Sequence, residues 1–379
     1  MTQRPELTVF WHPVMLEHKP PDGAFKFPSP DFLAVEEPHP ERPERIENIK
    51  GMITGVLNNH TNLAQVDAAT YSEIASVHEP EYIDRVRSFS ESGGGRIEDT
   101  TTGGNGATFE AARHASGAAV EAVKMAHRTD SHTVPYALVR PPGHHAQSDQ
   151  ADGFCFFNHT AVAAEQVLNI EGVNSIAIVD WDVHHGNGTQ EIFYDRADVL
   201  PISIHTDHGS WHSELHPQTG SIEEDGVNDG EGYTVNIPVP PAIGNEGYER
   251  VLDALVEPII AEYEPDMIVA GAGQDAGIAD PNARNMIDRF GFRDIARKVR
   301  SYAHSYANEN LAVIQEGGYQ ISHLPFATLG VLEGVLDITV DLSEYGYDED
   351  PFSWLEELNK PTKEWIEQAR AHHTNHWPV

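Results

Sequence analysis

The sequence has 379 residues, and its 60 acidic side chains outnumber the 24 basic ones to give a formal net charge of −36. This excess of carboxylates argues against a protein that follows nucleic-acid phosphates, which needs a basic face, and against docking on anionic lipid. No apolar run approaches the roughly 20 residues that cross a bilayer, and no secretory signal is recognisable at the N-terminus. The single cysteine, Cys155, excludes an internal disulfide framework. We therefore expect a soluble, cytoplasmic protein.

The basic residues are unevenly divided, because only seven of the 24 are lysine. Many carboxylates combined with few lysines favour a surface adapted to high salt, so the composition predicts a halophilic protein. An ordinary acidic protein is the alternative.

Seven short apolar segments predict strands. Most of them are continuously apolar, which is typical of strands covered on both faces. In chain order they are residues 7–11, 136–139, 175–180, 199–205, 233–239, 267–272 and 311–315.

Longer segments with helical patterns alternate with these strands. They are residues 107–127, 160–170, 248–263, 292–308 and 363–371. The alternation predicts an α/β fold with a mainly parallel sheet. No linker interrupts it, so we expect one domain over residues 1–379, with an N-terminal loop region at 1–38 and a C-terminal extension at 340–379.

Three long segments between the predicted elements are expected to be loops, and such loops in a compact domain usually line a site. They are residues 12–45, 87–106 and 206–232. The last of them holds His208, His212 and His216, which could bind a second metal ion. A solvated loop is the favoured interpretation.

Four polar clusters follow four of the predicted strands. They are RPPGHHA at residues 140–146, DWDVHHGNG at 180–188, GAGQDA at 271–276 and QEGGY at 315–319. Ligands in open α/β folds bind outside the carboxyl ends of the strands. Four clusters at four strand ends therefore indicate one functional site.

The second cluster has the pattern of a metal site. In an extended chain Asp182 and His184 point to the same face, so both can reach one ion. This pair supplies an oxygen and a nitrogen that suit Zn²⁺. Asp275 ends another strand and adds a carboxylate, and three protein ligands leave one coordination position open, as in catalytic zinc sites.

The other clusters supply groups for proton transfer. Zinc can lower the pKa of its water to about 7. A nearby histidine, from the pair His144 and His145, can take that proton and return it to a leaving amine. A phenol such as that of Tyr319 can donate to the developing oxyanion. Together these residues predict metal-assisted amide hydrolysis.

The sequence resembles the histone deacetylase superfamily, and most of all its class II enzymes and the bacterial histone-deacetylase-like amidohydrolases. The matching residues are HPERPER at 39–45, VH at 77–78, RPPGHHA at 140–146, GFCFFN at 153–158, DWDVHHGNGTQ at 180–190, DA at 275–276 and EGGY at 316–319. The resemblance runs from about residue 39 to residue 335. It implies the arginase/deacetylase fold, with a parallel sheet of about eight strands.

The resemblance implies two kinds of metal site. One Zn²⁺ per chain, with Fe²⁺ as the alternative ion, is bound by Asp182, His184 and Asp275. A structural K⁺ is bound, largely through main-chain oxygens, by Asp180, Asp182, His184, Ser203 and Ile204. A second K⁺ near Phe193 is a weaker expectation.

The resemblance also implies roles in catalysis. His144 and His145 flank the attacking water, with His145 as the general base and general acid. Asp180 orients His144, and Asn187 contacts His145. Tyr319 polarises the acetyl carbonyl.

The resemblance further implies a narrow channel for the acyl-lysine side chain. Phe154 forms one wall and Gly153 lines it, while Gly317 and Gly318 also contact the substrate. Asp99 matches a rim position that accepts hydrogen bonds from substrate.

Two features are interpreted as structural. Residues 38–45 resemble a helix start, in which Glu44 and Arg45 could pair across the floor of the site. Cys155 lies in an apolar run and is expected to be a small buried side chain.

The sequence thus predicts a zinc-dependent deacetylase that hydrolyses the acetyl amide of N-acetylated lysine in a protein or peptide. The alternative is an acetylpolyamine amidohydrolase, which the acidic composition weakly favours. Asn282 stands where polyamine-selective relatives carry Glu and protein deacetylases often carry Leu. A manganese-type arginase relative fits less well, and an inactive acyl-lysine-binding protein would need a broken site. We expect neither nucleic acid nor membrane as a partner, and a homo-oligomer remains an option.

Overall fold

The computed structural model describes residues 6–58, 61–98, 101–128, 133–207, 219–282 and 285–347. Several predictions lie outside these residues. They concern Asp99, the three histidines His208, His212 and His216, and the helix at 363–371. Among the described residues, no helix is long and apolar enough to cross a membrane.

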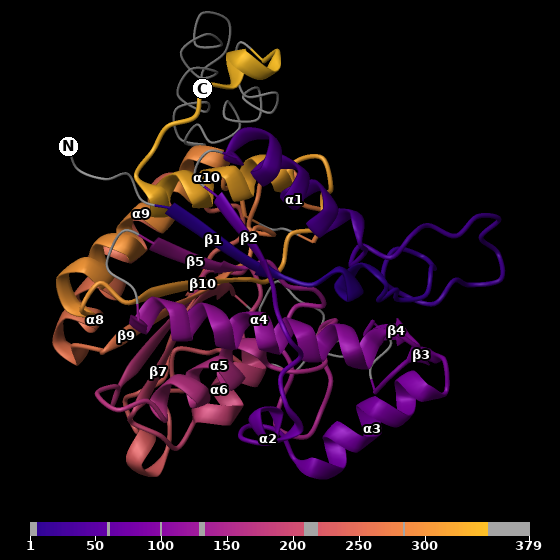
Figure 1. Cartoon of the computed structure of the whole chain (residues 1–379), viewed down its shortest axis with the longest axis horizontal. Helices are drawn as coiled ribbons and strands as arrows, with labels where there is room; N and C mark the ends of the chain where they lie inside the picture. The colour runs from indigo at the N-terminus through magenta and orange to yellow at the C-terminus, as the bar shows by residue number, and fades with distance from the viewer. Residues whose placement is uncertain are drawn as a thin grey trace, which may run out of the picture.

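A parallel sheet of eight strands forms the centre of the fold (Figure 1). The strands are β1 (Glu6–Trp11), β2 (Thr61–Gln65), β5 (Thr133–Ala137), β6 (Ile176–Asp180), β7 (Val199–Thr206), β8 (Val235–Val239), β9 (Met267–Ala272) and β10 (Leu311–Gln315). Their spatial order is β2-β1-β5-β10-β9-β6-β7-β8, and every neighbouring pair is parallel. A separate antiparallel hairpin joins β3 (Gly94–Arg96) to β4 (Gly103–Asn105). The predicted α/β fold is confirmed.

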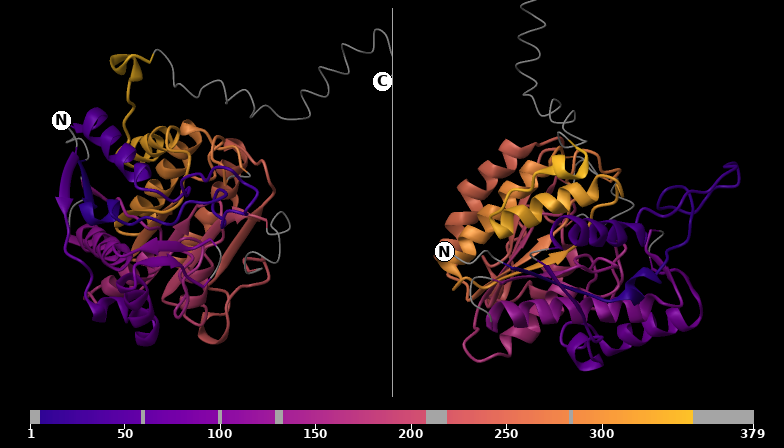
Figure 2. Two further views of the ribbon diagram at one scale, coloured as in Figure 1. Left: turned by 90° about the vertical axis from the view of Figure 1, so that its right-hand side faces the viewer. Right: turned by 45° about the horizontal axis from the view of Figure 1, so that its top comes forward.

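Helices cover both faces of the sheet (Figures 1 and 2). One layer holds α1 (Glu44–Val56), α7 (Asn245–Val251), α8 (Glu257–Tyr263), α9 (Arg289–Tyr306) and α10 (Leu324–Leu336). The other holds α2 (Tyr71–Ile74), α3 (Pro80–Glu91), α4 (Thr108–Arg128), α5 (His159–Leu168) and α6 (Asn187–Phe193). The small residues of α4 are fully buried, as expected for a helix packed closely on a sheet.

Several elements differ from the predictions for identifiable reasons. The edge strand β2 has the polar, partly exposed sequence TNLAQ, so it lacks an apolar run. Helix α10 was missed because nearly all of its residues are buried, which removes the two-faced pattern of a surface helix. The predicted strand at 136–139 begins at Thr133, and Pro135 lies inside it opposite Thr8 of β1. The helix predicted at 248–263 contains one π-helical turn, Leu252–Val256.

The order of the strands brings the four polar clusters together. They follow β5, β6, β9 and β10, and these strands are neighbours in the order β5-β10-β9-β6. Because the strands are parallel, all four clusters leave the same edge of the sheet. The four clusters, which are spread between residues 140 and 319 of the chain, therefore meet at the middle of that edge.

A buried ion pair joins the helices α9 and α10. Arg289 donates from Nε and Nη2 to the two carboxylate oxygens of Glu333, at 3.1 and 2.8 Å. Glu333 also accepts from the backbone N–H of Val340 at 2.7 Å. The carboxylate is fully buried and Arg289 is nearly so, and water therefore solvates neither charge well.

We predict that Glu333→Ala lowers the free energy of unfolding by about 3–5 kcal/mol, because it leaves the Arg289 charge buried without its carboxylate. Urea unfolding of the purified protein measures this change. The control is Asp294→Ala, since Asp294 pairs with Arg297 where both side chains are nearly half exposed, and a loss below about 1 kcal/mol is expected there. Equal losses in the two variants would contradict the prediction.

Candidate metal centre

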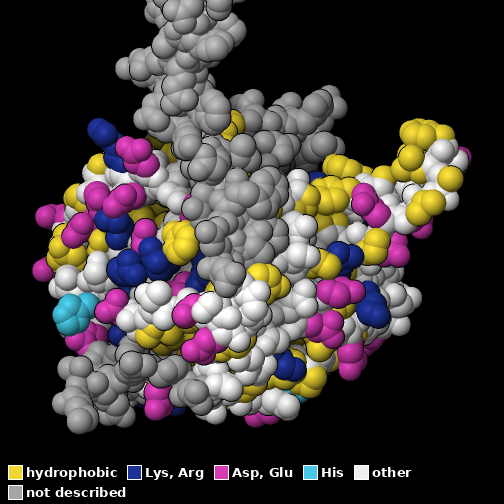
Figure 3. Space-filling model, turned by 90° about the horizontal axis from the view of Figure 1, so that it is seen from above, with side chains coloured by type: hydrophobic (Ala, Val, Ile, Leu, Met, Phe, Trp, Pro, Cys, Tyr) yellow, Lys and Arg dark blue, Asp and Glu magenta, His cyan; other side chains and the backbone are white. Residues whose placement is uncertain are grey.

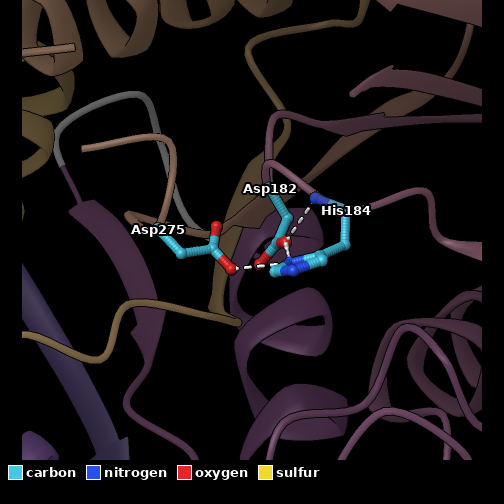
Figure 4. Close-up of side chains that lie close together, drawn as sticks. All are labelled: Asp182, His184 and Asp275. Carbon is cyan, nitrogen blue, oxygen red and sulfur yellow. Dashed lines mark hydrogen bonds and ion pairs between the residues drawn. The ribbon is translucent and has the colours of Figure 1, made fainter. Parts of the chain in front are cut away.

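Three side chains that could bind a metal ion converge at the edge of the sheet (Figure 4). Asp182 and His184 follow β6, and Asp275 follows β9. Their potential ligand atoms all lie within 4.8 Å of one another. His184 Nδ1 is 3.0 Å from an oxygen of Asp182 and 2.9 Å from Oδ2 of Asp275. The structure thus brings together the three predicted zinc ligands.

The donor set fits a divalent cation. Oδ2 of Asp275 is buried and faces the His184 ring, whose Nδ1 lies 2.9 Å away, since a buried carboxylate without a positive partner is costly. Its other oxygen accepts from the backbone N–H of Val183 at 3.0 Å, which aims Oδ2 at the other two side chains. Two carboxylates and one imidazole are ligands that Zn²⁺ accepts.

Two glycines make room for the carboxylates. A Cβ atom at Gly317 would overlap oxygens of both Asp182 and Asp275, and one at Gly273 would overlap Asp182. The backbone N–H of Gly317 also donates to Asp182 at 2.8 Å. The predicted importance of Gly317 therefore has a steric reason, and Gly273 is an additional residue that the site requires.

The charges at this point are strongly coupled. Burial opposes ionisation of Asp182, but the cationic rings of His144 and His184 hold the pKa of Asp182 well below its usual value. Burial and the charge of Asp182 raise the pKa of Asp275. Burial lowers the pKa of His184, yet Asp275 and Asp182 overcome this effect and raise it to about 9. Positive charge at this point is therefore stabilised, as a metal site requires.

The two adjacent histidines have different partners. His144 Nδ1 lies 2.8 Å from a carboxylate oxygen of Asp180, whereas His145 Nδ1 lies 2.6 Å from the amide oxygen of Asn187. The amide of Asn187 is held in this orientation because its Nδ2 donates to Asp152 at 3.0 Å. Burial lowers the pKa of His144, but the carboxylates of Asp182 and Asp180 raise it well above its usual value. One ring thus faces a carboxylate and the other a neutral amide.

Tyr319 is held in position by Asp280, which binds its backbone, and by Arg45, which lies against its ring. Its backbone N–H donates to Asp280 Oδ2 at 2.5 Å, and the Arg45 guanidinium lies 4.6 Å from the centre of its ring. Arg45 also donates to the carbonyl of Glu316 at 2.7 Å. Burial raises the pKa of the Tyr319 phenol well above its usual value, although Arg45 opposes this. The phenol therefore stays protonated at neutral pH and can donate a hydrogen bond.

The expected pair of Glu44 and Arg45 does not form. Glu44 is exposed on α1, and Arg45 instead pairs with the fully buried Glu41 at 3.0 Å, one helical turn earlier. Glu41 also lies 2.7 Å from Arg140 and 3.2 Å from His18. Burial would raise the pKa of Glu41, but these cationic groups hold it far below its usual value.

The residues of the expected channel wall lie beside Tyr319 and His145. The ring of Phe154 is 5.5 Å from that of Tyr319 and nearly perpendicular to it. Gly153 has a φ of +52°, and a Cβ there would overlap the ring of His145. Gly318 also has a positive φ, of +118°, which glycine adopts without strain. Cys155 is buried, as expected.

Sequence reasoning missed three carboxylates that organise the site. Asp152 orients Asn187, Asp280 binds the turn of Tyr319, and Glu41 holds Arg45. Glu41 was visible in the motif at 39–45, and Asp280 stands before a proline at the end of the 271–280 segment. Their partners are far away in the sequence, so no local pattern assigned them.

Comparisons with known proteins agree with this geometry. A family model described as the histone deacetylase domain matches residues 39–335. Histone deacetylase 8 of Arabidopsis thaliana is 38% identical over 373 residues, which are 98% of this chain and 97% of that protein. The histone deacetylase-like amidohydrolase of Pseudomonas aeruginosa is 37% identical over 78% of this chain and 76% of its own length.

Solved structures show the same fold. The HD domain of HDA15 superposes with a TM-score of 0.77 at 32% identity, over 88% of this chain and 89% of that one. The acetylpolyamine aminohydrolase of Burkholderia pseudomallei gives a TM-score of 0.74 at 26% identity, over 87% and 98%. Fold and site together define an α/β amidohydrolase. The chain belongs to the histone deacetylase family.

Buried neutral histidines fix the loop that carries the histidine pair. His78 Nδ1 lies 2.8 Å from the carbonyl of Gln147, and its Nε2 accepts from the backbone N–H of Asn158 at 2.8 Å. His159 lies 3.0 Å from the carbonyl of Pro141 and 2.9 Å from the hydroxyl of Ser116. Burial lowers the pKa of both rings to about 4.

We predict that these histidines make the fold sensitive to acid. In the unfolded chain each titrates near 6.5, but in the folded protein only near 4, so the unfolded chain binds more protons between these values. The stability is complete above pH 6.5 and falls as the pH drops towards 4, by up to about 3 kcal/mol for each histidine. Urea midpoints measured from pH 7.5 to 4.5 test this.

The variant His159→Gln should be less stable at pH 7 but show a flatter dependence on pH over that range. The control His304→Gln changes an exposed histidine, and its profile should follow the unmodified protein. An unchanged slope in His159→Gln would count against the prediction.

Proposed function

We propose that the protein is a zinc-dependent deacetylase that hydrolyses the acetyl amide of N-acetylated lysine in a protein or peptide. The observation that carries the proposal is the convergence of Asp182, His184 and Asp275, whose potential ligand atoms lie within 4.8 Å of one another beside two histidines with different partners. Membership of the histone deacetylase family supports the same chemistry.

The metal ligands in this proposal are Asp182, His184 and Asp275. A bound Zn²⁺, or Fe²⁺ in the same ligand set, would polarise the acetyl carbonyl and make water a better nucleophile at neutral pH. The two buried carboxylates that converge there and the charge balance described above support a cation at this point.

The two histidines have different roles in proton transfer because their hydrogen-bond partners differ. The amide oxygen of Asn187 faces Nδ1 of His145, so that ring keeps its proton on Nδ1 and its Nε2 can accept the proton of the attacking water. The same nitrogen then returns the proton to the leaving lysine amine. His144 faces the carboxylate of Asp180, which favours the charged ring and its Nε2–H as a donor to developing negative charge.

Substrate contacts complete the proposal. The phenol of Tyr319 donates to the acetyl oxygen as negative charge develops on it. Phe154 and Gly153 form the channel wall, and Gly317 and Gly318 border it. Asp99 is proposed for the rim from the sequence resemblance alone.

Potassium is proposed as a structural ion bound by residues of β6, of the segment that follows it and of β7. Asp180 and Ser203 are direct neighbours across the parallel strands, and both line a small cavity of about 10 Å³, close to the least space that can hold a single water-sized species. The set also includes Asp182, His184 and Ile204. The cytoplasmic location, the halophilic surface and the single domain over residues 1–379 likewise stay proposals.

An acetylpolyamine amidohydrolase is the second candidate. The structural similarity to an acetylpolyamine aminohydrolase favours it, as does the net charge of −36. Turnover of an acetyl-lysine peptide and of acetylspermidine, each with and without a hydroxamate chelator in high KCl, separates the candidates. Turnover of neither substrate by zinc-loaded protein would reject both and leave an acyl-lysine-binding protein.

We predict that Asp275→Asn weakens zinc binding more than tenfold, because an amide replaces one charged ligand. Metal content after dialysis against a buffered zinc solution, read by mass spectrometry, gives the result without an activity assay. The exposed carboxylate of Asp294 provides the control Asp294→Asn, which should retain zinc. Equal zinc content in the two variants would refute the assignment.

We predict that Tyr319→Phe lowers kcat by about 10²–10³-fold with little change in KM, because one donor to the oxyanion is lost. Steady-state kinetics on the better substrate measure both constants, and the zinc content should not change. Tyr71→Phe is the control, since the hydroxyl of Tyr71 donates to the carbonyl of Pro80, the first residue of α3. A full kcat in Tyr319→Phe would remove the phenol from the mechanism.

A further inference from the structure

A segment of the N-terminal region, residues 20–38, projects from the body as an arm (Figures 1 and 3). Its base folds back on itself where Ala24 and Phe27 exchange backbone hydrogen bonds of 2.9 and 3.2 Å. Lys26 lies inside this tight turn. Arg96 of the hairpin strand β3 donates to the carbonyl of Lys26 at 2.9 Å, which fixes the turn against the body.

The side chain of Lys26 reaches the outer end of the channel wall. Its Nζ lies 5.9 Å from the centre of the Phe154 ring and donates to Oδ1 of Asn282 at 3.4 Å. Phe154 in turn packs edge-to-face on Tyr319. The ammonium group therefore stands one aromatic ring away from the catalytic phenol.

Asn282 adds a second donor at the same place. Its side chain is only 4% exposed, and its Nδ2 is buried with no hydrogen-bond partner. The residue is held in position because its backbone N–H donates to Oδ1 of Asp280 at 2.8 Å. Its Oδ1 accepts from Lys26, whereas the Nδ2 donor has no acceptor, and a buried donor without an acceptor is costly.

We propose that Lys26 and Asn282 form a donor pair that selects substrates with a carboxylate beside the acetylated lysine, so that the preferred substrate is an acidic acetyl-lysine peptide. This inference rests on the proposed function and names its substrate class. A carboxylate accepts from an ammonium and from an amide N–H at once. An acetylpolyamine instead brings ammonium groups, which Lys26 repels.

The overall negative charge does not decide this choice. Surface charges farther away than about 10 Å are largely screened at 0.1 M salt, whereas the donor pair would touch the substrate directly. The local donors therefore outweigh the distant carboxylates once the substrate is at the channel mouth.

The test compares kcat/KM at fixed ionic strength for three substrates: an acetyl-lysine peptide with flanking Glu, the same peptide with Lys in place of Glu, and acetylspermidine. We expect the unmodified protein to prefer the acidic peptide over the basic one about tenfold, equivalent to about 1.4 kcal/mol. Lys26→Met should reduce this ratio to about one, and Lys26→Arg should restore most of it.

Two more variants sharpen the comparison. Asn282→Asp has nearly the same shape but replaces the donor by a carboxylate, so it should raise the relative rate on acetylspermidine. The control is Lys124→Met near the end of α4, where the lysine pairs with Glu121 and Glu73; its substrate preference should equal that of the unmodified protein.

A ratio near one in the unmodified protein, or an unchanged ratio in Lys26→Met, would overturn the inference while leaving the deacetylase proposal intact. Failure to turn over any of the three substrates would instead reject the proposed function. Affinities for the two peptides, measured by fluorescence anisotropy, test the donor pair in that case as well. Equal affinities for the acidic and the basic peptide would overturn it.

Discussion

The convergence of two buried carboxylates on one point is the constraint on which the rest of the site depends. Asp182 and Asp275 lie beside each other in a region that excludes water, where like charges repel strongly. The surrounding structure meets this demand in several ways: His184 and His144 supply positive charge, and two glycines allow the backbone to come close. A cation is the component that would complete the balance.

The same electrostatic logic explains why adjacent histidines differ. A carboxylate beside His144 and an amide beside His145 set two protonation states within one dipeptide. The two rings are adjacent in sequence and lie close together in space, with their centroids 4.0 Å apart. Their protonation states differ because His144 faces Asp180 and His145 faces Asn187.

Much of the fold and of the candidate site could be predicted from the sequence, wherever a local residue pattern indicated the element or the ligand. Apolar runs located seven of the eight strands, and the spacing of Asp182 and His184 indicated a shared ligand point. The edge strand β2 and the buried helix α10 lacked the periodicity that such predictions need. Arg45 pairs with Glu41 and not with Glu44, because Glu41 is buried before α1 begins whereas Glu44 is exposed on the helix. The contact of Lys26 with Asn282 spans 256 positions and has no local signature.

The place of β10 has a consequence for how the molecule is made. It is the last strand among the residues that the structure describes, yet it lies in the middle of the sheet, between β5 and β9. Until it emerges from the ribosome, the sheet consists of two separate halves, each with an open inner edge that could pair wrongly. The turn bearing Tyr319 follows β10 directly, so the strand that closes the sheet also delivers this phenol. A nascent chain stopped before residue 311 would therefore lack both a continuous sheet and Tyr319, the tyrosine proposed to polarise the acetyl carbonyl.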